Sequence, residues 1–155
     1  MKATFASPLT ALFLPALTTT VSADPSPDYS RQPISASCMT IALKDNHVLS
    51  ATCLAPSSSG SSAGPSYASS DLELDGCLAN YAGDLSWPAG DGGGGGFSST
   101  CDDCYLDGSA GTTLTCECGR GGDEGGTKRS TWDLDDWKYV QNTRGVLTCS
   151  YDDKP

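Results

Sequence analysis

The sequence predicts an all-β fold made of two pseudo-symmetric repeats that interlock and are stabilised by disulfides. Three observations support this prediction. The 155 residues include eight cysteines. The same anchor residues recur in the same order over 34–87 and 97–149. Between the cysteines, apolar and polar residues alternate, as in Leu49–Cys53, which is typical of half-buried β-strands.

The N-terminal segment predicts export. A short apolar run over 11–17 follows the basic Lys2 and leads to the small residues Val21–Ala23. This pattern is typical of a cleaved signal peptide, here over 1–23, and the run is too short to span a bilayer. We therefore expect a secreted, extracellular protein, with a linker over 24–33 before the folded domain.

The charge of the chain excludes one class of partner. Its formal net charge is −10, from 9 basic and 19 acidic side chains. Such a surface is repelled by phosphate backbones and by anionic lipid. We expect no nucleic-acid partner and no membrane insertion.

Laying 34–87 over 97–149 aligns residues that bound strands and turns, and duplication is the simplest account of so many matches in one order. The coinciding pairs are Cys38 and Cys101, Leu43 and Leu106, Leu49 and Leu114, Cys53 and Cys118, Asp75 and Asp135, Asn80 and Asn142, Gly83 and Gly145, and Leu85 and Leu147.

Each opening and closing cysteine predicts a β-hairpin between them. Asp45–Asn46 and 107–111 supply the turns, because Asp, Asn and Gly tolerate the backbone angles that tight hairpins require. Short helical turns are predicted at Leu72–Asp75 and Trp132–Asp135. A further short strand is predicted in each repeat, at the segments Gly83–Trp87 and Gly145–Cys149.

Two segments predict irregular structure. The serine-rich segment Ser57–Ser70 is typical of an exposed, mobile loop, and its counterpart is Gly119–Ser130. The glycine-rich segment 88–96 predicts a flexible hinge between the repeats. Such a hinge would let repeats exchange between chains, so the expected states are a monomer or a domain-swapped dimer.

The cysteines predict four disulfides, since the secretory route is oxidising. Cys38–Cys53 follows from the first hairpin, and Cys101–Cys118 is its repeat equivalent. Cys104–Cys116 is then nested inside the second hairpin. Parity leaves Cys77–Cys149, which would join the first repeat to the end of the second and so interlock them.

Metal sites are the main alternatives. The thiols of Cys101, Cys104, Cys116 and Cys118 have a spacing that could bind zinc, although secretion favours disulfides. The segment Asp71–Gly76 resembles the start of a calcium loop but lacks the glutamate at the twelfth position. We therefore expect no metal and no cofactor.

Glycoside hydrolysis is a further alternative, because Asp133, Asp135, Asp136 and Glu73 offer carboxyl groups. That reaction requires two carboxyls roughly 5–9.5 Å apart across the bond. Aspartates at the start of a helical turn more often cap it. We expect no enzymatic activity.

The repeated anchors resemble the cyanovirin-N homology (CVNH) domain family. The residues that carry the likeness are Thr100–Cys101, Leu106, Leu114–Cys118, Leu134–Asp136, Asn142 and Gly145–Leu147. The likeness covers about Ile34–Tyr151, and the domain is expected over 34–152. It implies a two-lobed β fold in which segments of both repeats complete each lobe. It also implies a lectin that binds mannose-containing oligosaccharides or glycoproteins.

The resemblance also implies the residues that contact sugar. One site would use Asn80, Ser99, Thr100 and Arg120. The other would use Ser37, Asp136 and Asn142. Hydroxyl, amide, carboxylate and guanidinium groups of this kind can replace the water that is hydrogen-bonded to sugar hydroxyls.

The second of these sites is expected to be the poorer one. Leu54 and Ala55 follow Cys53 where members of the family usually offer polar groups. The alternative function is therefore a secreted structural or effector protein that keeps the scaffold and has lost sugar binding.

Overall fold

The computed structural model describes residues 32–56, 65–88, 95–122, 125–136 and 139–150. The predicted signal peptide and most of the predicted linker and hinge lie outside these ranges. The elements in chain order are α1 (Ile34–Ser37), β1 (Cys38–Lys44), β2 (Val48–Ala55), β3 (Ser66–Glu73), η1 (Leu74–Gly76), β4 (Ala79–Tyr81), β5 (Asp84–Ser86), η2 (Phe97–Ser99), β6 (Cys101–Asp107), β7 (Thr113–Gly119), β8 (Thr127–Asp133), β9 (Val140–Thr143) and β10 (Val146–Cys149).

The described strands form two antiparallel three-stranded sheets, β1-β2-β3 and β6-β7-β8, and two hairpins, β4-β5 and β9-β10. Each three-stranded sheet contains one predicted cysteine hairpin, with Cys38 opposite Cys53 and Cys101 opposite Cys118. In the first hairpin Asp45 has a positive φ of 48°, as the predicted turn requires.

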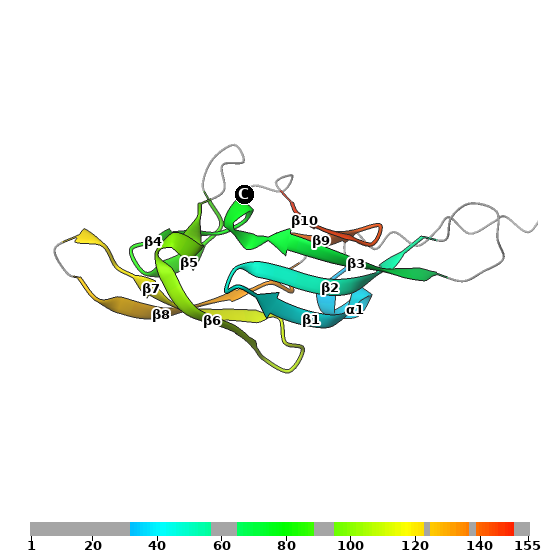
Figure 1. Ribbon diagram of the computed structural model, residues 1–155, viewed down its shortest axis with the longest axis horizontal. Helices are drawn as coiled ribbons and strands as arrows, with labels where there is room; N and C mark the ends of the chain where they lie inside the picture. Colours follow the sequence, from blue (N-terminus) through cyan, green and yellow to red (C-terminus); the bar gives the residue numbers. More distant parts are fainter. Residues whose placement is uncertain (1–31, 57–64, 89–94, 123–124, 137–138, 151–155) are drawn as a thin grey trace, which may run out of the picture.

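The two repeats exchange their last hairpins. The β9-β10 hairpin of the second repeat lies on the first sheet, where the backbone N–H of Leu147 donates to Ser70 Oγ at 2.9 Å. The β4-β5 hairpin of the first repeat lies on the second sheet, where the N–H of Leu85 donates to Ser130 Oγ at 2.8 Å (Figure 1). The fold is therefore the predicted all-β arrangement of interlocked repeats.

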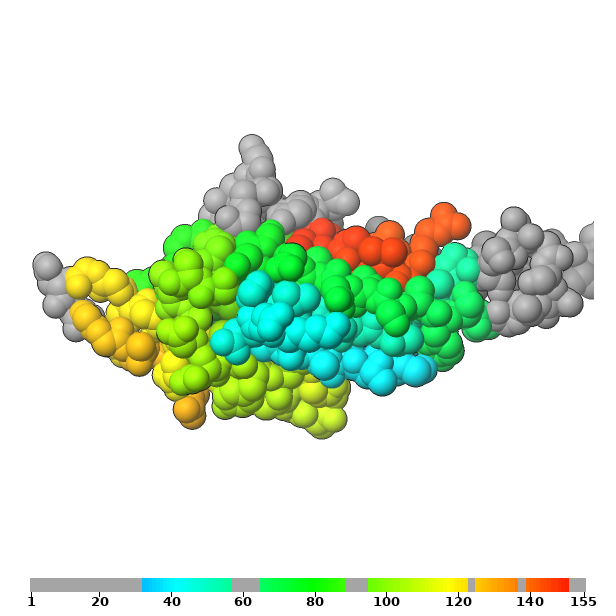
Figure 2. Space-filling model, viewed as in Figure 1, coloured from blue at the N-terminus to red at the C-terminus, as the bar shows by residue number. Residues whose placement is uncertain are grey.

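We call the first sheet with β9-β10 lobe A, and the second sheet with β4-β5 lobe B. In the space-filling view, the red surface of the C-terminal strands lies over the cyan and green surface of the first repeat, within lobe A (Figure 2).

Two equivalent aspartates also join the repeats, because each accepts hydrogen bonds from a serine of the other repeat. Asp75 accepts from the backbone N–H of Ser98 at 2.9 Å, and Asp135 accepts from that of Ser35 at 2.8 Å.

One buried core runs through both lobes. Its largest members have no exposed surface, which is where apolar side chains contribute most to stability. They are Ile34, Leu49, Leu74, Leu78, Phe97, Leu114, Leu134 and Val140. Because these residues come from both repeats, neither lobe has a core of its own.

The four disulfides in the structure are Cys38–Cys53, Cys77–Cys149, Cys101–Cys118 and Cys104–Cys116, the four pairs that the sequence predicts. Cys77–Cys149 joins residues 72 positions apart, one from each repeat. All eight thiols are used in these bridges, so none is left as a zinc ligand.

Two sequence predictions were partly wrong. Ser66–Ser70 is not loop but the first part of β3, paired with β2. These small polar residues suit an outer strand whose outward face meets solvent, and composition alone does not separate this case from a loop. The predicted helical turn at Leu72–Asp75 begins only at Leu74. In its counterpart, Trp132 and Asp133 belong to strand β8, and Leu134 and Asp135 form a turn.

The described residues contain no helix long and apolar enough to cross a membrane.

Candidate functional site

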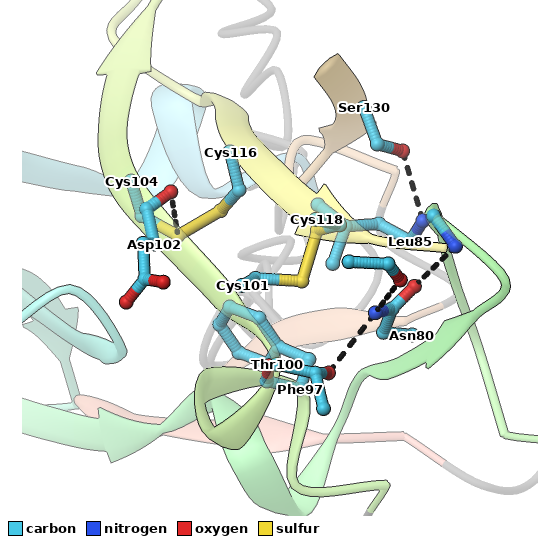
Figure 3. Close-up of a disulfide and its surroundings, with 12 residues drawn as sticks. Asn80, Leu85, Phe97, Thr100, Cys101, Asp102, Cys104, Cys116, Cys118 and Ser130 are labelled. Carbon is cyan, nitrogen blue, oxygen red and sulfur yellow. Dashed lines mark hydrogen bonds between the residues drawn. A yellow bond between two sulfur atoms is a disulfide. The ribbon is translucent and has the colours of Figure 1, made fainter. Parts of the chain in front are cut away.

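The polar residues predicted for the first sugar site meet in lobe B around Asn80. The Nδ2 group of this residue donates to Thr100 Oγ1 at 3.0 Å and to the carbonyl of Gly119 at 2.8 Å. Its Oδ1 atom accepts from the backbone N–H of Gly83 at 2.8 Å (Figure 3). Asn80 thus joins three segments, two of them from the other repeat.

The turn between β4 and β5 explains how Asn80 reaches these partners. Ala82 and Gly83 both have positive φ, 54° and 96°. Glycine at the second position avoids the steric cost that a side chain would meet there. A Cβ added at Gly83 would also lie only 3.1 Å from Lys128 Cβ and 3.2 Å from Arg120 Cγ. The turn therefore fits closely against the end of β7 and the start of β8.

Ser99 and Thr100 present hydroxyls beside this turn. Both residues are exposed, because η2 ends here and the chain enters β6. Ser99 Oγ donates to the carbonyl of Gly96 at 2.8 Å. Thr100 Oγ1 accepts from Asn80 and can donate to the carbonyl of Phe97 at 3.3 Å. These bonds fix the direction of each hydroxyl before any ligand arrives.

Arg120 extends the same surface, and the sequence did not single out its neighbour Lys128. Arg120 is exposed and follows Gly119 at the end of β7. Lys128 stands opposite Cys118 in the sheet, and its ammonium group pairs with Asp84 of β5. The pairing of β7 with β8 is the signal that could have identified Lys128. In the sequence, Gly119–Ser130 is instead the counterpart of a predicted loop. Together, Asn80, Ser99, Thr100, Arg120 and Lys128 form what we call the lobe B site.

The residues predicted for the second site do not form an equivalent surface. Asn142 is fully buried, with 0% exposure, and Ser37 is 2% exposed. Asn142 Nδ2 donates to the carbonyl of Leu54 at 3.0 Å, and its Oδ1 accepts from the N–H of Gly145 at 2.8 Å. Neither side chain therefore offers surface for a sugar to contact.

Asp136, the third residue predicted for that site, lies in the loop before β9. It is half-buried, and its backbone carbonyl accepts from the N–H of Tyr139 at 3.0 Å. Asn142 and Ser37 are thus internal residues of lobe A, and contact of this second set with sugar stays a prediction.

The carboxylates of the alternative calcium site have other partners. The pKa of Asp71 is lowered by hydrogen bonds from Ser50 and Lys44. Asp75 accepts from Ser98. Glu73 lies 3.4 Å from the ring of His47. In the part of the chain that the structure describes, no group of three or more metal-binding side chains converges.

The aspartates considered for hydrolysis have partners within the protein. Asp135 accepts from both the backbone and the hydroxyl of Ser35 in the other repeat, at 2.8 and 2.6 Å. Asp133 accepts from the N–H of Asp135 at 2.9 Å. Asp133 thus bonds to the backbone two residues on, as aspartate commonly does in turns.

Comparisons with known proteins match this architecture. A family model described as the CVNH domain matches residues 34–148. The CVNH protein of T. borchii is 27% identical with a TM-score of 0.58, covering 76% of this chain and 99% of its own. The Gibberella zeae CVNH is 25% identical with a TM-score of 0.55, covering 74% and 94%. Microvirin, solved as a complex with mannobiose, is 25% identical with a TM-score of 0.58, covering 77% and 99%. A search of curated proteins finds no match.

Proposed function

The chain belongs to the CVNH domain family, and we propose that it is a secreted lectin whose main carbohydrate site is the lobe B site. The observation that carries this proposal is the bonded chain from Gly83 through Asn80 to Thr100. It holds the exposed Thr100 hydroxyl in a fixed direction, and the backbone of Thr100 is bonded to Gly119, which Arg120 follows. Fixed donors and acceptors lower the entropy cost of binding a flexible polar ligand.

In this proposal Asn80 positions the site, and its neighbours make the contacts. Both Nδ2 hydrogens of Asn80 are already donated to Thr100 and Gly119. Ser99, Thr100 and Arg120 are exposed, so their polar groups can pair with adjacent hydroxyls of a sugar ring. Binding needs no metal in this arrangement.

Mannose-containing oligosaccharides are the proposed ligands. Microvirin, a protein of similar fold, was solved in complex with mannobiose, and this supports a ligand of the same class here. Asn142 and Ser37 of lobe A are buried, so we propose one functional site per chain.

A glycan array followed by titration calorimetry tests the proposal. We expect the mature protein to bind mannose oligosaccharides, and Thr100→Ala to lose most of that affinity. Thr40→Ala is the matched control, because Thr40 is an exposed threonine of lobe A whose hydroxyl also makes hydrogen bonds within the protein. A flat array would instead favour the alternative of a scaffold that has lost sugar binding.

A further inference from the structure

The two lobes have equivalent turns with opposite surroundings. Gly83 in lobe B and Gly145 in lobe A each donate the same type of bond, from the backbone N–H to Oδ1 of the asparagine three residues earlier. A Cβ added at Gly83 would meet the side chains of Lys128 and Arg120, whereas one added at Gly145 would meet those of Ala55 and Ala68. The side chains packed against this glycine, which we call the rim, are therefore cationic in lobe B and apolar in lobe A.

The cationic rim stands out against the charge of the whole chain, which is −10. Five basic side chains lie in the described ranges, and three of them are at this end of lobe B: Arg120, Lys128 and Arg129. Arg129 is paired with Glu117 at 2.8 Å. Lys128 is paired with Asp84.

Among the described residues beside the turn, Arg120 and Lys128 are cations, and Asp84 is the anionic partner of Lys128. Asp84 also restrains the ammonium group of Lys128, which reduces the entropy that a long side chain loses when it binds. The stems of Arg120 and Lys128 both lie against Gly83, so the two cations flank one short turn.

We propose that the lobe B site prefers glycans that carry an acidic group, either a carboxylate or a phosphate or sulfate ester. This inference rests on the proposed lectin function and names its ligand class more closely. Ser99 and Thr100 would hold the neutral hydroxyls of the sugar, and Arg120 with Lys128 would hold the acidic group.

The chemistry of arginine favours such a ligand. Its planar guanidinium group can donate two parallel hydrogen bonds to a carboxylate or phosphate, and such charge-assisted bonds are shorter and stronger than neutral ones. Because the protein as a whole is acidic, diffuse attraction of anions does not contribute. Any preference for an acidic glycan must therefore come from these local groups.

The test compares three probes by calorimetry: a neutral mannose oligosaccharide, its phosphorylated counterpart, and an oligogalacturonate. We expect at least one acidic probe to bind about tenfold more tightly than the neutral one, and its affinity to fall as salt is raised. In Arg120→Gln and Lys128→Gln the ratio of acidic to neutral affinity should fall towards one.

Arg144→Gln is the matched control, because Arg144 is an exposed arginine on the equivalent turn of lobe A. It removes the same charge from the chain and should leave the ratio unchanged. Equal affinity for neutral and acidic probes overturns this inference and leaves the lectin proposal standing. An equal fall of the ratio of acidic to neutral affinity in Arg144→Gln also overturns this inference. Absence of binding to every probe overturns both proposals.

Discussion

Replacing Asn80 and Asn142 separately by alanine should uncouple stability from sugar binding. The two residues are repeat equivalents, and each ties a turn to the segment after a closing cysteine of the other repeat. Asn80 also donates to the exposed Thr100 hydroxyl, whereas Asn142 is fully buried. We therefore expect both variants to lose stability, and only Asn80→Ala to lose affinity.

The expected losses follow from the bonds removed. Asn80 makes three hydrogen bonds, which at about 1 kcal/mol each amount to about 3 kcal/mol. Asn142 makes two, but its partners, the N–H of Gly145 and the carbonyl of Leu54, would be left unpaired next to a buried cavity. Each such group costs about 1–3 kcal/mol. The two groups together amount to about 2–6 kcal/mol, so the free energy of unfolding should fall by a comparable amount in Asn142→Ala.

Urea denaturation and calorimetry with a mannose oligosaccharide measure the two effects on the same protein. Both variants should fold at low temperature, since the four disulfides are retained. Loss of affinity in both variants, in proportion to their loss of stability, would refute the reasoning. It would mean that sugar binding reports the integrity of the fold and not the local position of Thr100.

Two further predictions concern the scaffold. Replacing Cys77–Cys149 by serines should lower the free energy of unfolding by about 4 kcal/mol, because it joins residues 72 apart. Replacing Cys104–Cys116 should lower the free energy of unfolding much less, since this bridge spans 12 residues inside a hairpin that Cys101–Cys118 already closes. Guanidinium denaturation of both variants measures the two losses, and a larger loss for the Cys104–Cys116 variant would contradict this prediction. Gly145→Ala should cost about 2 kcal/mol or more, because φ is +94° and its Cβ would overlap a neighbouring strand. Gly76→Ala, with nothing within 4 Å of the new Cβ, should leave the melting temperature nearly unchanged.

The hairpins and the three bridges inside them could be predicted because their signals are local, and Cys77–Cys149 then followed from parity. Alternation over Leu49–Cys53 and the spacing of the cysteines need no knowledge of the rest of the chain. The outer strands could not be predicted in the same way. Ser70 and Ser130 are buried and accept bonds from the exchanged hairpins. Their role depends on partners from the other repeat, and a serine-rich segment without apolar alternation favours a loop prediction.

The site was predicted unevenly for a related reason. The structure brings Ser99, Thr100 and Arg120 to one end of lobe B, and their contact with sugar stays a prediction. The resemblance did not indicate that Asn142 and Ser37 are buried, because burial depends on how closely the exchanged hairpin packs. Lys128 was missed because it reaches the turn only through the pairing of β8 with β7.

The comparison of the two lobes separates what holds this fold together from what gives it specificity. Both asparagines bond to the turn glycine and to the carbonyl after a closing cysteine, so these two bonds are the same in each lobe. Asn80 adds a third bond, to Thr100. The rims differ, with Arg120 and Lys128 on one side and Ala55 and Ala68 on the other. Because the rim side chains do not make the shared bonds, a rim can change from cationic to apolar without weakening them. In the lectin that we propose, specificity is therefore set by residues that contribute little to stability, which would let one lobe bind glycans while the other serves only the fold.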